Sequence, residues 1–68
     1  MTARERMVML DTARGLTAQQ IADHRDLSLF GVQHTLRRVK RALGAETIAH
    51  AVALSIALGY VDPEDVTA

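Results

Sequence analysis

The stretch TAQQIADHRDLS (residues 17–28), followed by Val32 and by LRRVKR (36–41), decides how this chain folds. Its first part has the length and the capping signals of a short helix, and its second part begins a longer helix that ends in basic residues. Two helices joined by a tight connection form a helix-turn-helix, whose second helix is suited to a DNA groove. The helix over residues 28–43 is therefore the main candidate for a functional element, because no other segment suggests chemistry.

Length and composition restrict the class of protein. A chain of 68 residues forms one small domain, which buries only about 60% of its unfolded surface. The absence of cysteine excludes a disulfide framework, a zinc finger and a thiol nucleophile. His24, His34 and His50 are scattered along the chain, so we expect them at the surface and expect no metal site and no cofactor.

Other functions are disfavoured on similar grounds. No pair of polar residues has catalytic spacing, and a domain of this size has little room for a pocket. We therefore expect neither an enzyme nor a small-molecule ligand. No apolar run is long enough to span a bilayer and no leader precedes the first helix, so we expect a cytoplasmic protein.

Charge is segregated along the chain, although the formal net charge is zero. Residues 1–44 hold all eight basic residues and four acidic ones, a net charge of +4. The remaining residues hold four acidic residues and no basic one. A basic half favours a polyanionic partner, and solvated helix faces are the alternative interpretation.

Start and stop signals predict an all-α fold of four helices. Thr2 and Thr17 each precede a Glu or Gln by three residues, which is the pattern of a capping box, and Ser28 is a third N-cap. Glycines follow three of the expected helices, where a left-handed residue ends a helix. The third helix has an apolar stripe at spacings of 4, 3 and 4, formed by Val32, Leu36, Val39 and Leu43. The helices are predicted at about 2–14, 17–24, 28–43 and 47–58, with the turn at 25–27.

The helix over 47–58 is nearly all apolar, which is unusual for a helix at the surface of a small domain. One of its faces must pack on the other helices. The opposite, alanine-rich face is predicted to meet a second copy of the chain, with Ile48, Val52 and Ile56 as candidate dimerisation residues. Asp62 and Pro63 open at most a short terminal turn, so residues 62–68 are predicted as an acidic tail after a domain over 1–61.

Four blocks of the sequence stand out together: Thr2–Glu5; Gly15–Thr17 with Ile21–Ala22; Ser28 with Val32, Leu36 and Val39; and Leu43–Gly44 with Ala51–Ala53 and Leu58–Val61. These blocks resemble the DNA-binding domain of the LuxR/FixJ class of bacterial transcription regulators. The match is free of gaps over residues 1–61. The resemblance implies a four-helix helix-turn-helix domain, in which the second and third helices read DNA and the fourth mediates dimerisation. The family's sensing domain is not part of this sequence, so we expect either a free-standing, nucleoid-associated regulator or an excised fragment.

The departures from the family pattern concern both the core and the reading helix. Asp11 and Thr12 stand where the family buries leucine-like residues. Gly31 replaces a common threonine, and glycine within a helix costs roughly 1 kcal/mol relative to alanine. The family usually has lysine at the position of Gln33 and histidine at that of Thr35.

The third helix supplies the candidate contacts to double-stranded DNA. Glutamine pairs with adenine and arginine with guanine in the major groove, so Gln33, His34 and Arg37 are the candidate base-reading residues. Phosphate contacts need cations, hydroxyls or helix N-termini. The candidates for them are Thr17, Arg38, Lys40 and Arg41.

The alternative function is a protein-binding module on the same scaffold, which engages another transcription protein and binds DNA weakly or not at all. Leu29 and Phe30 stand at the start of the third helix, where polar residues are usual. The helical register leaves Met7 and Leu10 near the surface. These four residues are the candidates for an apolar surface that contacts a protein or the methyl groups of DNA, since exposed apolar clusters usually mark contacts. Packing of Phe30 on the first or second helix is the alternative.

Overall fold

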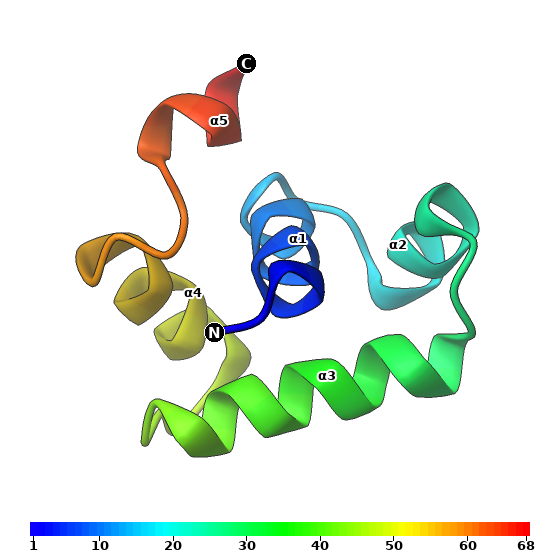
Figure 1. The fold of residues 1–68 in the computed structure, drawn as a ribbon, viewed down its shortest axis with the longest axis horizontal. Coiled ribbons are helices and arrows are strands. Elements are labelled where there is room, and N and C mark those ends of the chain that lie inside the picture. Colours follow the sequence, from blue (N-terminus) through cyan, green and yellow to red (C-terminus); the bar gives the residue numbers. More distant parts are fainter.

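The computed structural model describes residues 1–68 as five helices without strands. Helix α1 lies in the middle of the fold, with α2 on one side and α4 on the other, and α3 runs beneath all three (Figure 1). The helix-turn-helix formed by α2 and α3 therefore packs on one central helix. The bounds are α1 Ala3–Ala13, α2 Ala18–Arg25, α3 Leu29–Ala42, α4 Ile48–Ala57 and α5 Pro63–Thr67.

Side-chain caps begin every helix, which explains why the boundaries could be read from the sequence. The predicted capping boxes of Thr2 with Glu5 and of Thr17 with Gln20 are both present. The Ser28 hydroxyl accepts the backbone N–H of Gly31 at 2.9 Å. Each such cap stabilises a helix by about 1 kcal/mol. The caps therefore define where α1, α2 and α3 begin, independently of how the helices pack.

The end of α2 differs from the prediction. We expected the helix to stop near Asp23 or His24, but it continues to Arg25. It ends at Asp26, which adopts the left-handed conformation with φ of 56°. Aspartate tolerates this conformation better than most residues. The turn is therefore shorter than expected, and Arg25 belongs to the helix.

Two clusters of buried side chains form the core. The first joins α1, α2 and α3 through Val8, Ile21, Ala22 and Val32, and Leu27 packs against it. The second joins α1, α3 and α4 with the segment after α4, through Met9, Val39, Ala51 and Val61. The predicted stripe of α3 is confirmed, because Val32 and Val39 are fully buried while Leu36 and Leu43 pack against the clusters.

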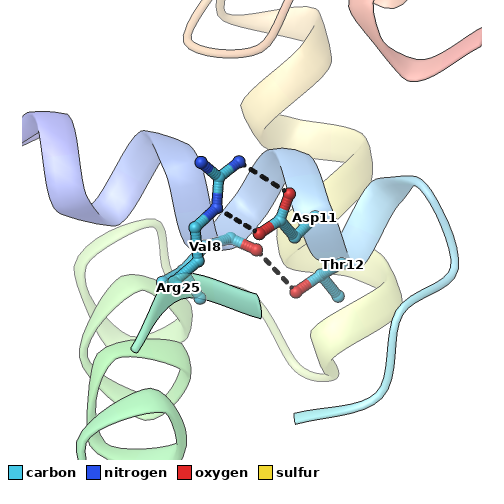
Figure 2. Close-up of polar contacts among 4 residues, drawn as sticks. All are labelled: Val8, Asp11, Thr12 and Arg25. Carbon is cyan, nitrogen blue, oxygen red and sulfur yellow. Dashed lines mark hydrogen bonds and ion pairs between the residues drawn. The ribbon is translucent and has the colours of Figure 1, made fainter. Parts of the chain in front are cut away.

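Asp11 of α1 is buried and forms an ion pair with Arg25 of α2. The Nε and Nη2 atoms of Arg25 donate to the two carboxylate oxygens of Asp11 at 2.8 and 3.0 Å (Figure 2). The Asp11 side chain is 2% exposed, whereas 27% of the Arg25 side chain reaches solvent. This hydrogen-bonded pair raises the pKa of Arg25. A buried carboxylate is tolerated only when it is paired in this way, so the pair fixes α2 against α1.

Thr12 is the second polar residue at a position where the family has a leucine-like residue, and its polar group is also satisfied. Its hydroxyl donates to the backbone carbonyl of Val8 at 2.8 Å, one turn earlier in α1 (Figure 2). Thr35 and Ser55 make the same bond to the carbonyls of Gly31 and Ala51. No buried side-chain polar atom is left without a partner, so the polar substitutions are compatible with the fold.

Residues 62–68 are more ordered than the predicted acidic tail. Asp62 caps α5 by accepting the N–H of Glu64 at 2.9 Å, and Pro63 occupies the first turn as expected. Val66 packs against the second core cluster, and Arg14 donates to the carbonyl of Ala68 at 2.7 Å. The segment therefore continues the fold as a short helix against α1.

Breaking the ion pair should destabilise the domain. We expect Asp11→Asn to lower the free energy of unfolding by about 2 kcal/mol, less than for a fully buried pair, because Arg25 can recover some hydration. Replacing both partners, as Asp11→Leu with Arg25→Met, should restore stability to near the wild-type value. Urea denaturation measures both effects, with Asp23→Asn on the exposed face of α2 as the control. A loss below about 0.5 kcal/mol, as for an ordinary surface substitution, would mean that the pair does not hold α1 to α2.

Candidate nucleic-acid interface

The face of α3 opposite its core stripe carries the residues suited to nucleic acid. Phe30, His34, Arg37 and Arg41 recur at spacings of 4, 3 and 4, half a helical turn away from the Val32 stripe, and all four are exposed. The helix contains no acidic residue. We call this exposed side of α3 the outer face.

The predicted base-reading residues Gln33, His34 and Arg37 are all exposed on or beside the outer face. The ring of His34 stacks on that of Phe30, with centroids 6.3 Å apart and an angle of 14° between the planes. This contact restricts His34 on one side. Gln33 and Arg37 form no side-chain hydrogen bond or ion pair within the chain, so their polar ends are available to an external partner.

Basic side chains continue toward the C-terminal end of α3. Arg37, Lys40 and Arg41 line one open hollow of about 300 Å³ together with Ala45. Three cations at one hollow create a positive potential that attracts an anion such as a phosphate. The structure therefore brings together three of the residues that the sequence singled out.

Arg38 lies on the other flank of α3, beside α1. Its Nε is 3.6 Å from a carboxylate oxygen of Glu5, and 69% of its side chain is exposed. The pKa of Glu5 lies below its ordinary value, first because the backbone N–H of Thr2 donates to its carboxylate, and further because Arg38 is near. Glu5 is therefore ionised at neutral pH and orients Arg38, which keeps most of its surface open.

Thr17 begins α2 and also serves as its cap. Its Oγ1 accepts the backbone N–H of Gln20 at 3.2 Å, and its own backbone N–H donates to the Gln20 side chain at 2.9 Å. A hydroxyl that accepts one hydrogen bond retains its own hydrogen as a donor. Thr17 can therefore cap the helix and contact a phosphate at the same time.

Arg4 is a candidate that the sequence reasoning missed. A Cβ atom at position 31 would lie 2.9 Å from Nη2 of Arg4, so glycine there allows the guanidinium to approach α3 closely. Arg4, His34 and Arg38 line a hollow of about 450 Å³ that also includes Phe30. The replacement of the common threonine by Gly31 was the available signal, but only the packing of α1 on α3 connects it to Arg4.

Comparison with known protein families shows to which family the chain belongs. A family model described as bacterial regulatory proteins of the luxR family matches residues 1–55. The chain belongs to the LuxR family. Searches of curated proteins and of solved structures gave no significant match. LuxR-family domains of this type are DNA-binding transcription regulators.

The apolar residues predicted as one contact surface of this LuxR-family domain fall into two groups. Phe30 is 71% exposed and Leu29 is 37% exposed, both at the start of α3. Met7 and Leu10 instead line a separate hollow of about 220 Å³ with Tyr60 and Val61. Leu10 is also half-buried and packs against the second core cluster. Met7 and Leu10 therefore both reach the surface, Leu10 only in part, and they line a different hollow from Phe30.

The three dimerisation candidates lie on the flanks of α4. Val52 and Ile56 are half-buried and pack against the second core cluster, and Ile48 is half-buried as well. The most exposed side of α4 is formed by Ala49, Ala53 and Ala57, and it continues to Leu58, which is 60% exposed. Part of the apolar character of α4 therefore serves the core, and the alanines form the open side.

The structure contains no group of three His, Cys, Asp or Glu side chains that would hold a metal ion. His24, His34 and His50 are exposed, as predicted. No helix of this LuxR-family domain has the length and apolar character needed to cross a membrane.

Proposed function

We propose that this LuxR-family chain is a sequence-specific transcription regulator that inserts α3 into the major groove as part of a dimer. The observation that carries the proposal is the outer face of α3. It presents hydrogen-bonding and cationic side chains to solvent and has no acidic residue, while the opposite side of the helix is buried. A helix with these two faces can be held by its own domain and still contact a duplex along its length.

The proposed contacts divide along α3. Gln33, His34 and Arg37 read base edges, because Gln33 and His34 belong to the half of the helix that enters the groove first and Arg37 lies one turn after Gln33. Arg38, Lys40 and Arg41 neutralise phosphates, and Thr17 contacts the backbone from the start of α2. Arg4 adds a further cation on the α1 side of the groove.

Dimerisation is proposed to occur through α4. Its open side consists of alanines, which allow two helices to approach closely, while Ile48, Val52 and Ile56 border it. A symmetric dimer would present two copies of α3 to half-sites about one helical turn apart. It would also bury apolar surface that a domain of this size leaves exposed.

A substitution on the open side of α4 should separate the dimer. We expect Ala53→Glu to sediment as a monomer while keeping its helical circular dichroism spectrum, because Ala53 is exposed and a buried charge at an interface is costly. Val52→Asp would be a poorer test, since Val52 also packs against the core. The control is Ala3→Glu on α1, which should sediment like the wild type. A wild-type protein that stays monomeric at high micromolar concentration would refute the dimer.

Affinity for DNA should fall steeply with salt. Each phosphate contact contributes a slope near −0.9 to the plot of log binding constant against log salt concentration. We expect Arg41→Gln to weaken binding to all duplexes alike and to reduce that slope by about one contact. Fluorescence anisotropy with a random-sequence duplex at several salt concentrations measures both quantities.

The control for this titration is Arg6→Gln, which removes the same charge from the side of α1 where Arg6 lies 5.6 Å from the centre of the Tyr60 ring. This variant should keep the wild-type slope. Equal slopes for Arg41→Gln and the wild type would remove Arg41 from the interface. Failure of the wild type to bind any duplex at low salt would favour the alternative protein-binding module.

A further inference from the structure

Phe30 is the most exposed large apolar side chain of the chain, with 71% of its surface open to solvent. It is the second residue of α3 and so lies at the N-terminal end of the helix, which is the end proposed to enter the major groove first. Phenylalanine is usually buried, and the core side of α3 is already filled by the Val32 stripe. The exposure of Phe30 therefore requires a reason outside the folding of the domain.

The backbone at Phe30 is held by the cap of α3, and its ring has one stacked neighbour. The Ser28 cap anchors the backbone on one side of it, by accepting the N–H of Gly31. The stacking contact with His34 holds its ring along the outer face of α3. A ring restricted in this way loses little conformational entropy when it meets a partner.

The surroundings of Phe30 favour a polyanion rather than a protein. The hollow that it lines contains Arg4, His34 and Arg38, and the one acidic residue there, Glu5, is held by Thr2 and Arg38. Arg37 and Arg41 continue the same face toward the other end of α3. An apolar ring within a cationic surface fits an apolar group embedded in an anionic partner.

The major groove of DNA contains one such group, the C5 methyl of thymine, which phenylalanine can contact. We propose that Phe30 is a specificity-determining residue that selects thymine by contact with this methyl group. The inference rests on the function proposed above. The methyl contact of Phe30 would add to the hydrogen bonds proposed for Gln33 and Arg37. It would specify thymine at the part of the half-site that faces the N-terminal turn of α3.

The test compares duplexes that differ only in the methyl group. A random-sequence duplex pool is enriched on the wild-type protein and then amplified with either dTTP or dUTP, because uracil lacks the C5 methyl. Binding to the two pools is measured by anisotropy for the wild type, for Phe30→Ala and for Leu29→Ala. Leu29→Ala is the matched control, since Leu29 is the neighbouring apolar residue and is half as exposed as Phe30. Thermal melting confirms that the variants fold.

We expect the wild type to bind the thymine pool about fourfold more tightly than the uracil pool, the effect of burying one methyl group. Phe30→Ala should bind both pools equally, near the wild-type affinity for uracil, whereas Leu29→Ala should keep the preference for thymine. Equal wild-type affinities, or a thymine preference that survives in Phe30→Ala, would overturn the inference and leave DNA binding intact. If Phe30→Ala matches the wild type on both pools, Phe30 belongs to a protein contact instead. Absence of wild-type binding at low salt would overturn the proposed function itself.

Discussion

The position of the helix-turn-helix depends on the ion pair between Asp11 and Arg25. The two residues are 14 positions apart in the chain, and their side chains are the only ones that form an ion pair between α1 and α2. Burying the Asp11 carboxylate without a partner would be costly, so docking of α2 on α1 is favoured where Arg25 reaches it. A pair of this kind adds less stability than a well-packed apolar contact, but it penalises any other placement of α2. The neighbouring apolar cluster of Val8, Ile21 and Val32 then supplies the packing.

In this arrangement the two sides of α3 have different roles. Val32 and Val39 hold it in the core, one in each cluster, while Arg37 and Arg41 remain on the opposite side. The helix rests on α1, α2 and α4 at once (Figure 1), so it can be presented rigidly to a partner. A groove-reading helix needs this rigidity, because base contacts require accurate placement of side chains. A small domain buries little surface, and the packing of one long helix against three others partly compensates for this.

Features encoded by local sequence were predictable, and those that depend on contacts between distant residues were not. The capping boxes of Thr2 and Thr17 and the stripe beginning at Val32 are local patterns, and the structure confirms them. The extension of α2 to Arg25 was missed, because the pairing with Asp11 becomes visible only after α1 and α2 are packed. The division of the apolar surface candidates has the same origin, since Met7 and Leu10 share a hollow with Val61 whereas Phe30 lines another hollow beside Arg4. Arg4 was missed because its approach to Gly31 joins two helices.

The central claim is that the outer face of α3, together with the start of α2, forms the surface that contacts DNA. The most direct measurement is an NMR titration of the isotopically labelled chain with a duplex from the enriched pool, which monitors every backbone amide. The largest chemical-shift changes should fall on residues 29–41 and around Thr17, with Arg4 affected as well and residues 62–68 unchanged. Changes confined to α5 and the adjacent side of α1, or their absence at saturating DNA, would contradict the claim.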